Sequence, residues 1–221
     1  MFLLSVSIVF AAWVEFDSAE YTEHKQPVSM HGVTIDEYQS YMDYKATIHL
    51  DKGWNLIAGG SEFLDEYLMP GSELSLDDLT VVYAFFPASK QYLQIYPEPS
   101  HDVIDAIAVK IKPEEKEELK TVAKWVYAKN AGILKMDFYI YYDVFALWKG
   151  WNLIAINPFL EGKTLNGFKG NCNIVKAYEF KDNNWVVWNL DKRINKQDLG
   201  KGIAIKSSND CVLYEQNENN S

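Results

Sequence analysis

The chain has 221 residues, of which 48% are hydrophobic and 14% are aromatic, and its formal net charge at pH 7 is -10. A chain of this length and hydrophobicity buries a core, which excludes wholesale disorder, and its aromatic content favours strands. The acidic balance and the lack of a Lys/Arg cluster exclude nucleic acid as a partner, because a nucleic-acid binder neutralises phosphates with basic side chains.

The first segment is apolar. Residues 1–14, MFLLSVSIVFAAWV, carry no charged side chain before Glu15. As a helix this segment spans about 20 Å, which is short of the roughly 30 Å hydrocarbon core of a bilayer. Its length matches the apolar region of a secretory signal, with Ala11 and Ala12 near a cleavage point, although no Lys or Arg precedes it. We therefore predict a signal segment over 1–14 and an extracellular or cell-envelope location. The alternative is a buried N-terminal strand or helix.

The next segments predict a linker and then strands. Residues 15–27 are mostly polar and predict a linker. Within residues 28–50, the alternation of apolar and polar side chains in VSMHGVTI and YKATIHL indicates strands. Between them, residues 36–44 predict a short helix.

The heptapeptide KGWNLIA occurs twice, at residues 52–58 and 149–155. Glycine permits a turn or a close backbone approach before a strand, and the following residues then alternate between the two faces. We expect Trp54 and Trp151 each to anchor a small core, with sugar stacking as the alternative role. We expect Asn55 and Asn152 to hold a neighbouring loop through their amides.

Acidic residues gather after the first of these strands, where six carboxylates fall within residues 62–78: Glu62, Asp65, Glu66, Glu73, Asp77 and Asp78. The favoured interpretation is a solvated loop, and no cofactor is predicted. Calcium is a weak alternative, because the DxDxDG spacing is missing. Glycoside hydrolysis would need two carboxylates about 5–10 Å apart across a cleft. The four histidines form no HExxH, HxH or Cys/His cluster, so no transition-metal site is predicted.

The two heptapeptides begin two similar stretches of sequence. TVVYAFFPASKQYLQI at 80–95 aligns without a gap on NIVKAYEFKDNNWVVW at 173–188, which places Val81 on Ile174 and Tyr92 on Trp185. Each stretch is an apolar run, a turn and a second apolar run, which is typical of a hairpin. YAKNAGIL at 127–134 aligns in turn on KSSNDCVL at 206–213. The offsets between the stretches are 97, 93 and 79 residues, and the differences fall between strands, where insertions are tolerated.

This pattern predicts an internal duplication and a mainly β fold made of two small tandem β domains, each sandwich-like or barrel-like. The first module covers residues 28–145, the second covers 146–215, and 216–221 form a disordered tail. The first module also holds an insertion in which Pro113 and the acidic residues after it predict a short helix running to about residue 124. The aromatic run at 136–148 suggests that the two modules pack against each other.

Two cysteines, Cys172 and Cys211, both lie in the second module. A pair confined to one module indicates a disulfide, which an exported protein keeps. Two separate buried thiols are the alternative.

A strand with Gly-Trp-Asn-Leu, an Ala-Tyr strand, a Trp-containing strand and a closing Gly-x-x-Ile-Lys strand resemble a small β module of secreted and surface proteins of bacteria and archaea. Residues 150–214 match best, with GWNLIAINP opening and LGKGIAIK closing the stretch, although Ile203 and Ala204 replace the family's aromatics. The first module departs further, at Ala123 and Lys124. The resemblance implies an extracellular β module in envelope or adhesion contexts, with no catalytic residues.

These observations favour a non-catalytic structural or adhesive protein whose partner is a cell-envelope polymer or another surface protein. Self-assembly by donation of the apolar N-terminal strand is also conceivable. The alternative is a carbohydrate-binding module that uses Tyr92, Trp185 and Trp188, which requires the two tryptophans to be exposed in a row. A lesser alternative is a secreted hydrolase with its site in the acidic 62–78 loop.

Overall fold

The computed structural model describes residues 13–24, 28–31, 33–35, 39–58, 67–99, 106, 109–112, 122–141 and 145–214. In these residues the fold is mainly β, as the sequence predicts. The named helical segments of this part of the chain are short 3-10 turns: Leu76–Asp78, Pro158–Leu160 and Lys196–Asp198. None of the described helical segments is long and apolar enough to cross a lipid bilayer.

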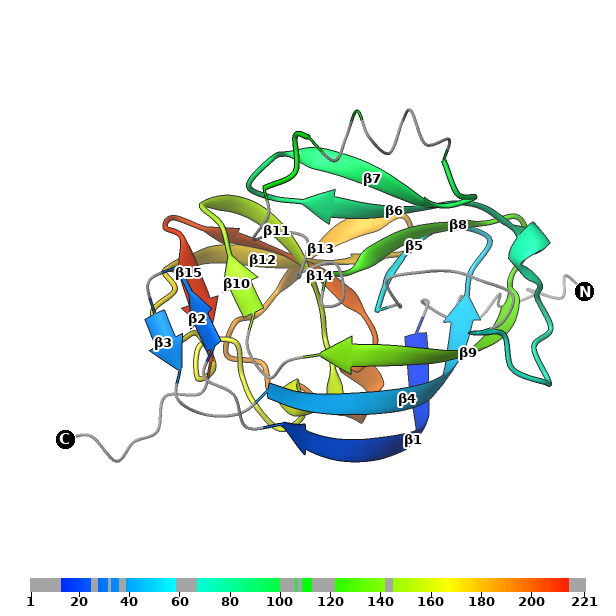
Figure 1. The fold of residues 1–221 in the computed structure, drawn as a ribbon, viewed down its shortest axis with the longest axis horizontal. Coiled ribbons are helices and arrows are strands. Elements are labelled where there is room, and N and C mark those ends of the chain that lie inside the picture. Colours follow the sequence, from blue (N-terminus) through cyan, green and yellow to red (C-terminus); the bar gives the residue numbers. More distant parts are fainter. Residues whose placement is uncertain are drawn as a thin grey trace, which may run out of the picture.

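Two four-stranded antiparallel sheets form the centre of the molecule (Figure 1). The first sheet has the order β5-β8-β6-β7, with strands Gly53–Ile57, Lys124–Ala128, Leu79–Phe86 and Gln91–Tyr96. The second sheet has the order β11-β14-β12-β13, with strands Gly150–Ala155, Gly202–Ser207, Ile174–Lys181 and Asn184–Trp188. The two heptapeptides therefore lie at equivalent places, in the edge strands β5 and β11.

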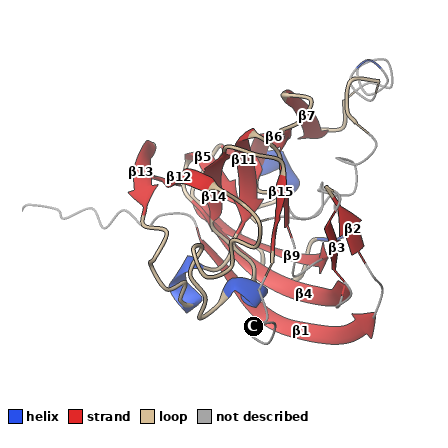
Figure 2. Ribbon diagram, turned by 90° about the vertical axis from the view of Figure 1, so that its left-hand side faces the viewer, coloured by secondary structure: helices blue, strands red, loops and turns tan. Residues whose placement is uncertain are grey.

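Each central sheet is covered on one face by further strands. A curved sheet of β1 (Trp13–His24), β4 (Gln39–Leu50) and β9 (Gly132–Tyr141) lies beneath the first sheet (Figure 2). The pair β10 (Phe145–Leu147) and β15 (Cys211–Leu213) covers the second sheet, and β2 (Val28–Met30) pairs with β3 (Val33–Ile35).

The ladders of the two sheets share one register. Trp54 lies opposite Tyr127 in the first sheet, and Trp151 lies opposite Lys206 in the second. The covering strands match as well, because Ile48 pairs with Leu134 where Phe145 pairs with Leu213. Residues at the same ladder position are called equivalent below. The structure thus contains two similar β domains.

The gapless alignment of the hairpins is wrong by two residues in its first strand. Val82 and Ala177 occupy the same position, opposite Val126 and Ile205. The offset is therefore 95 residues in β6 and β12, whereas it remains 93 in β7 and β13, where Tyr92 is equivalent to Trp185.

The physical reason lies in the turns. The hairpin of the first sheet turns through residues 87–90, and that of the second turns through Asp182 and Asn183 alone. Both of these residues have positive φ, at 51° and 58°. A two-residue hairpin of this type needs residues that tolerate that backbone, and Asp and Asn do so.

The two sheets are related by an approximate two-fold axis. Ile57 forms a bridge with Lys201, and the equivalent residues Ile154 and Val122 form the matching bridge in the reverse direction. Reciprocal contacts of this kind define an isologous interface. The buried residues at this interface come from both sheets: Leu56, Ala58, Ala123, Leu153, Ala155 and Ala204.

Two larger cores lie outside this interface, one on the outer face of each sheet. The first packs Val82 and Val126 against Ile48 and Leu134 of the covering strands. The second packs Ile203 and Ile205 against β10, β15 and the loops after β11. A disulfide between Cys172 and Cys211, with 5.0 Å between the Cα atoms, lies in this second core. The structure therefore has the predicted disulfide and not the alternative of two separate buried thiols.

Three predicted segments are corrected or lie outside the described residues. Residues 15–24 of the expected linker belong to β1, and residues 39–44 of the expected helix belong to β4, because the two strands pair along their whole length. Backbone pairing holds both segments extended in spite of their polar side chains. The expected helix after Pro113 lies mostly outside the described residues, and its last position, Lys124, begins β8. Residues 1–12 and 216–221 also lie outside them.

Candidate functional site

Trp54 and Trp151 do not anchor the cores. Their side chains are 39% and 40% exposed, and neither belongs to a buried cluster. Each is the second residue of its strand and directly follows a glycine, Gly53 or Gly150, that has positive φ. The buried interface begins two residues later with Leu56 and Leu153. The tryptophans therefore lie on the face of each sheet that packs against the other sheet, at the edge where this face meets solvent. This face is called the inter-sheet face below.

Asn55 and Asn152 hold the loop that precedes each strand. The Nδ2 atom of Asn152 donates to the carbonyl oxygens of Trp148 and Gly150 at 2.8 and 3.2 Å, and its Oδ1 accepts from the Trp148 backbone at 2.8 Å. Asn55 makes the same three bonds with Asp51 and Gly53. Both side chains are buried, so these bonds satisfy polar atoms that water does not reach.

Aromatic side chains cover the inter-sheet face and contact one another across it. Trp54 packs edge-on against Trp125, with 6.0 Å between ring centroids. Trp125 in turn contacts Phe180 and Trp185 of the other sheet at 4.8 and 5.7 Å. On the far side, Trp151 lies 5.9 Å from Tyr178. The three contacts of Trp125 are edge-to-face and that of Trp151 is tilted, and such pairs fix the positions of the rings and therefore the shape of the face.

A pocket of about 450 Å³ opens in this face. The first sheet supplies two of its aromatic walls and the second supplies the rest, so the pocket exists only where the sheets meet. Its lining residues are Phe85, Tyr92, Trp151, Leu153, Lys176, Tyr178, Trp185 and Ala204. We call it the aromatic pocket. An open, mostly apolar cavity with a few polar groups is the usual form of a small-molecule site.

The two-fold axis explains why there is a pocket on one side of the interface. Ala204 in the pocket is equivalent to Trp125 on the other side. The ring of Trp125 packs against Phe180, Trp185 and Trp54, which are equivalent to the pocket residues Phe85, Tyr92 and Trp151. Trp125 therefore fills the volume that Ala204 leaves empty.

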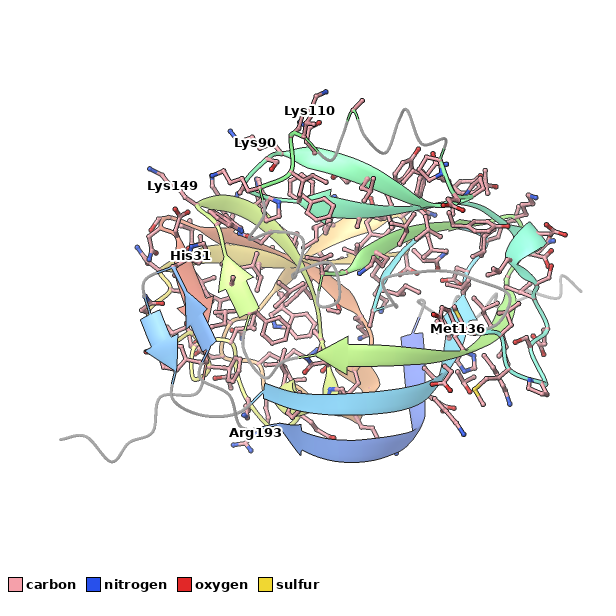
Figure 3. All side chains as sticks on the ribbon, in the orientation of Figure 1. His31, Lys90, Lys110, Met136, Lys149 and Arg193 are labelled. Carbon is pink, nitrogen blue, oxygen red and sulfur yellow. A yellow bond between two sulfur atoms is a disulfide. The ribbon has the colours of Figure 1, made fainter. Side chains whose placement is uncertain are left out.

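Two lysines lie close to Trp151, one of the two tryptophans of the pocket. The Nζ atom of Lys176 lies 5.4 Å from the ring centroids of both Trp151 and Tyr178, and that of Lys206 lies 5.9 Å from Trp151. These distances are within the range of cation–π contacts. Lys90, Lys110 and Lys149, by contrast, project outward from turns at the periphery (Figure 3).

Of the three ligand-binding residues predicted from the sequence, the structure brings two together. Tyr92 and Trp185, from the edge strands of the two sheets, both line the aromatic pocket. Partial burial raises the pKa of the Tyr92 hydroxyl, and a hydrogen bond with the side chain of Trp125 opposes this rise. Trp188 is only 3% exposed, and the Nζ atom of Lys192 lies over its ring, 4.1 Å from the centroid. The row of exposed tryptophans that the carbohydrate-binding alternative required is therefore not formed, because Trp188 is buried, and a carbohydrate site here depends on Tyr92 and Trp185 without Trp188.

The sequence prediction missed three residues of the site, namely Lys176, Tyr178 and Ala204, and it gave Trp151 a sugar-stacking role only as the alternative to a core role. The signal that would have found them is the difference between equivalent positions, where Ala204 replaces Trp125 and Lys176 replaces Val81. The two-residue error in aligning β6 with β12 hid the second of these differences.

In the acidic loop, the described carboxylates Asp78 and Glu73 are held by hydrogen bonds from neighbouring groups. Asp78 accepts hydrogen bonds from Ser75 and Asn130, which hold the pKa of its carboxyl below the usual range, and Glu73 accepts from the backbone of Ile133 at 3.2 Å. A general acid needs a raised pKa instead. Glu62, Asp65 and Glu66 lie outside the described residues. Within the described part of the chain, no three His, Cys, Asp or Glu side chains gather as metal ligands.

No protein-family model, curated protein or solved structure matches this chain.

Proposed function

We propose that this protein is a non-catalytic adhesive module of the cell envelope or extracellular space, and that it attaches to its partner by binding a carbohydrate in the aromatic pocket. The observation that carries this proposal is the joint exposure of Trp151, Trp185 and Tyr92 around one cavity. Aromatic rings present rigid apolar faces, which suit the C–H face of a sugar ring, while the Tyr hydroxyl and the indole N–H groups serve sugar hydroxyls.

The location and the origin of the fold belong to the same proposal. The Cys172–Cys211 disulfide supports an oxidising compartment, because thiols stay reduced in the cytosol. The repeated heptapeptide and the shared register of the two sheets support an origin by duplication. After duplication, one of two equivalent cavities kept a tryptophan and the other an alanine. A binding role is consistent with this divergence, since a purely structural repeat has no need of an empty cavity.

The test is a binding measurement with pocket variants. Trp151→Ala is expected to weaken binding to a soluble polysaccharide by at least about tenfold, because the loss of a buried aromatic anchor typically costs 2 kcal/mol or more. Affinity electrophoresis against a panel of neutral and acidic polysaccharides measures this effect. Trp54→Ala is the matched control, since Trp54 is equivalent and equally exposed but does not line the pocket.

A second variant tests the cavity itself. Ala204→Trp places in the pocket the residue that fills the equivalent volume in the other half, and it is expected to abolish binding while near-UV circular dichroism still reports a folded protein. Equal loss of binding in Trp54→Ala and Trp151→Ala, or undiminished binding by Ala204→Trp, would contradict the proposal.

A further inference from the structure

The aromatic pocket differs from its filled counterpart in charge as well as in volume. Lys176 occupies the position of Val81, and Lys206 occupies the position of Tyr127. Both substitutions add a positive charge on the side of the interface where the cavity is open. The chain as a whole has a net charge of -10, so two lysines at one cavity run against its general balance.

Neither Lys176, which lines the pocket, nor Lys206, which lies beside its Trp151 wall, is neutralised by a carboxylate of the described residues. The lining residues include no Asp or Glu, and among the described residues neither Lys176 nor Lys206 takes part in an ion pair. The nearby Glu179 lies within 3.8 Å of Lys201 instead. Both ammonium groups therefore remain available to an anion held over Trp151.

The geometry points to an acidic carbohydrate as the ligand, namely a polymer of uronic acid residues whose carboxylates meet Lys176 and Lys206 while a sugar ring packs on Trp151. This inference rests on the proposed function. An ammonium group only donates hydrogen bonds, and a carboxylate accepts them more strongly than a neutral hydroxyl because it carries the opposite charge. The two lysines approach the same indole from neighbouring strands, β12 and β14, and place their positive charges 5.4 and 5.9 Å from its ring centroid.

The experiment compares one polymer in two states of charge. Polygalacturonate and its carboxyl-reduced, neutral form share the same backbone and differ in the carboxylate. Isothermal titration calorimetry of the full chain with each polymer, at low and at high salt, gives the contribution of charge. The expected result is tighter binding of the acidic form by at least about tenfold at low salt, because hydrogen bonds to charged groups are the strong ones, and a smaller difference at high salt.

Variants assign this effect to the two lysines. Lys176→Gln and Lys206→Gln are each expected to weaken binding of polygalacturonate and to reduce its salt dependence, and to weaken binding of the neutral form by a smaller factor. The control is Lys196→Gln, which removes an exposed positive charge from the 3-10 turn before β14 and is expected to leave both affinities unchanged.

The outcomes separate the two proposals. Equal affinity for the acidic and neutral forms, with Trp151→Ala still abolishing binding, would overturn this inference and leave carbohydrate binding intact. A variant that combines Lys176→Gln and Lys206→Gln and still prefers the acidic form would also overturn this inference. Failure of either form and of the wider polysaccharide panel to bind would overturn the proposed function, and this inference with it.

Discussion

Lys124 is a lysine in the interior of the protein. Its side chain is fully buried, and its Nζ donates to the carbonyl oxygen of Val122 at 2.7 Å. Burial disfavours the charged ammonium and lowers the pKa of Lys124 to about 7. The equivalent residue in the second sheet is Ile203, which is also fully buried, so the backbone position is one that the fold keeps away from water.

Lys124 is expected to make the stability of the protein depend on pH. The unfolded chain holds the lysine proton up to a pKa near 10.4 and the folded chain releases it near 7, so the unfolded state binds more protons between these values. Stability therefore rises with pH across this window, by about 3 kcal/mol between pH 7 and about pH 9.5. Urea denaturation at several pH values measures this slope, and Lys124→Met is expected to remove it. A slope that is the same in the variant would contradict the assignment to Lys124.

Single residues also mark what the sequence predicts and what it does not. The alternation within KGWNLIA predicts correctly that Leu56 and Ala58 share a face, and both are buried in the interface. It cannot show where that face ends, which depends on the packing of the second sheet. Trp54 lies beyond this limit. A large repeated apolar side chain at the start of a strand predicted a core residue, and the alternation could not correct that prediction.

At the scale of elements, the two sheets approach each other closely at Gly202, the first residue of β14. A Cβ atom on Gly202 would lie 2.4 Å from Cγ of Leu56 and 2.7 Å from Cβ of Ala123. Ala123 is the residue equivalent to Gly202, so these two positions face each other across the two-fold axis. The missing side chain of Gly202 allows β5 and β14 to approach.

Gly202→Ala is therefore expected to lower the free energy of unfolding by about 2 kcal/mol, since overfilling a packed interface typically costs 1–3 kcal/mol. Chemical denaturation measures the loss. Ala123→Gly in the same chain removes one of the two contacts and is expected to restore part of it, which a double-mutant cycle detects. A Gly202→Ala variant as stable as the parent chain would contradict the close approach.

The strands themselves were largely predictable, because their alternation is local. The β5, β6, β7, β11, β12 and β13 strands all coincide with apolar runs that the sequence displays. The polar β1 strand was not predictable, because its extended form depends on backbone pairing with β4. Most residues of β1 pair with a residue more than twenty positions away along the chain. The aromatic pocket was out of reach for the same reason: Phe85 and Trp151 meet only after two sheets have packed.

At the scale of the whole molecule, the disulfide links the segment just before β12 to the last described strand. Cys172 and Cys211 are separated by 39 positions, and both are buried in the second core. A covalent bridge restricts the unfolded chain, and a loop of this size corresponds to roughly 4 kcal/mol in the chain-entropy model.

Replacement of both cysteines by alanine is expected to lower the free energy of unfolding by about 2–4 kcal/mol. Guanidinium denaturation of the oxidised parent chain and of the variant measures the difference. Reductant is expected to destabilise the parent chain by a similar amount and to leave the variant unaffected. Equal stability of the oxidised parent and the variant would show that the bridge contributes nothing to the folded state.

The exchange of Trp125 for Ala204 across the two-fold axis has a consequence for stoichiometry. In the described part of the chain, Trp125 fills the counterpart of the aromatic pocket, so under the proposed function each copy binds its polymer through one side of the sheet interface. Firm attachment to a long polymer would then come from avidity, with many copies displayed on one surface and each engaging its own sugar.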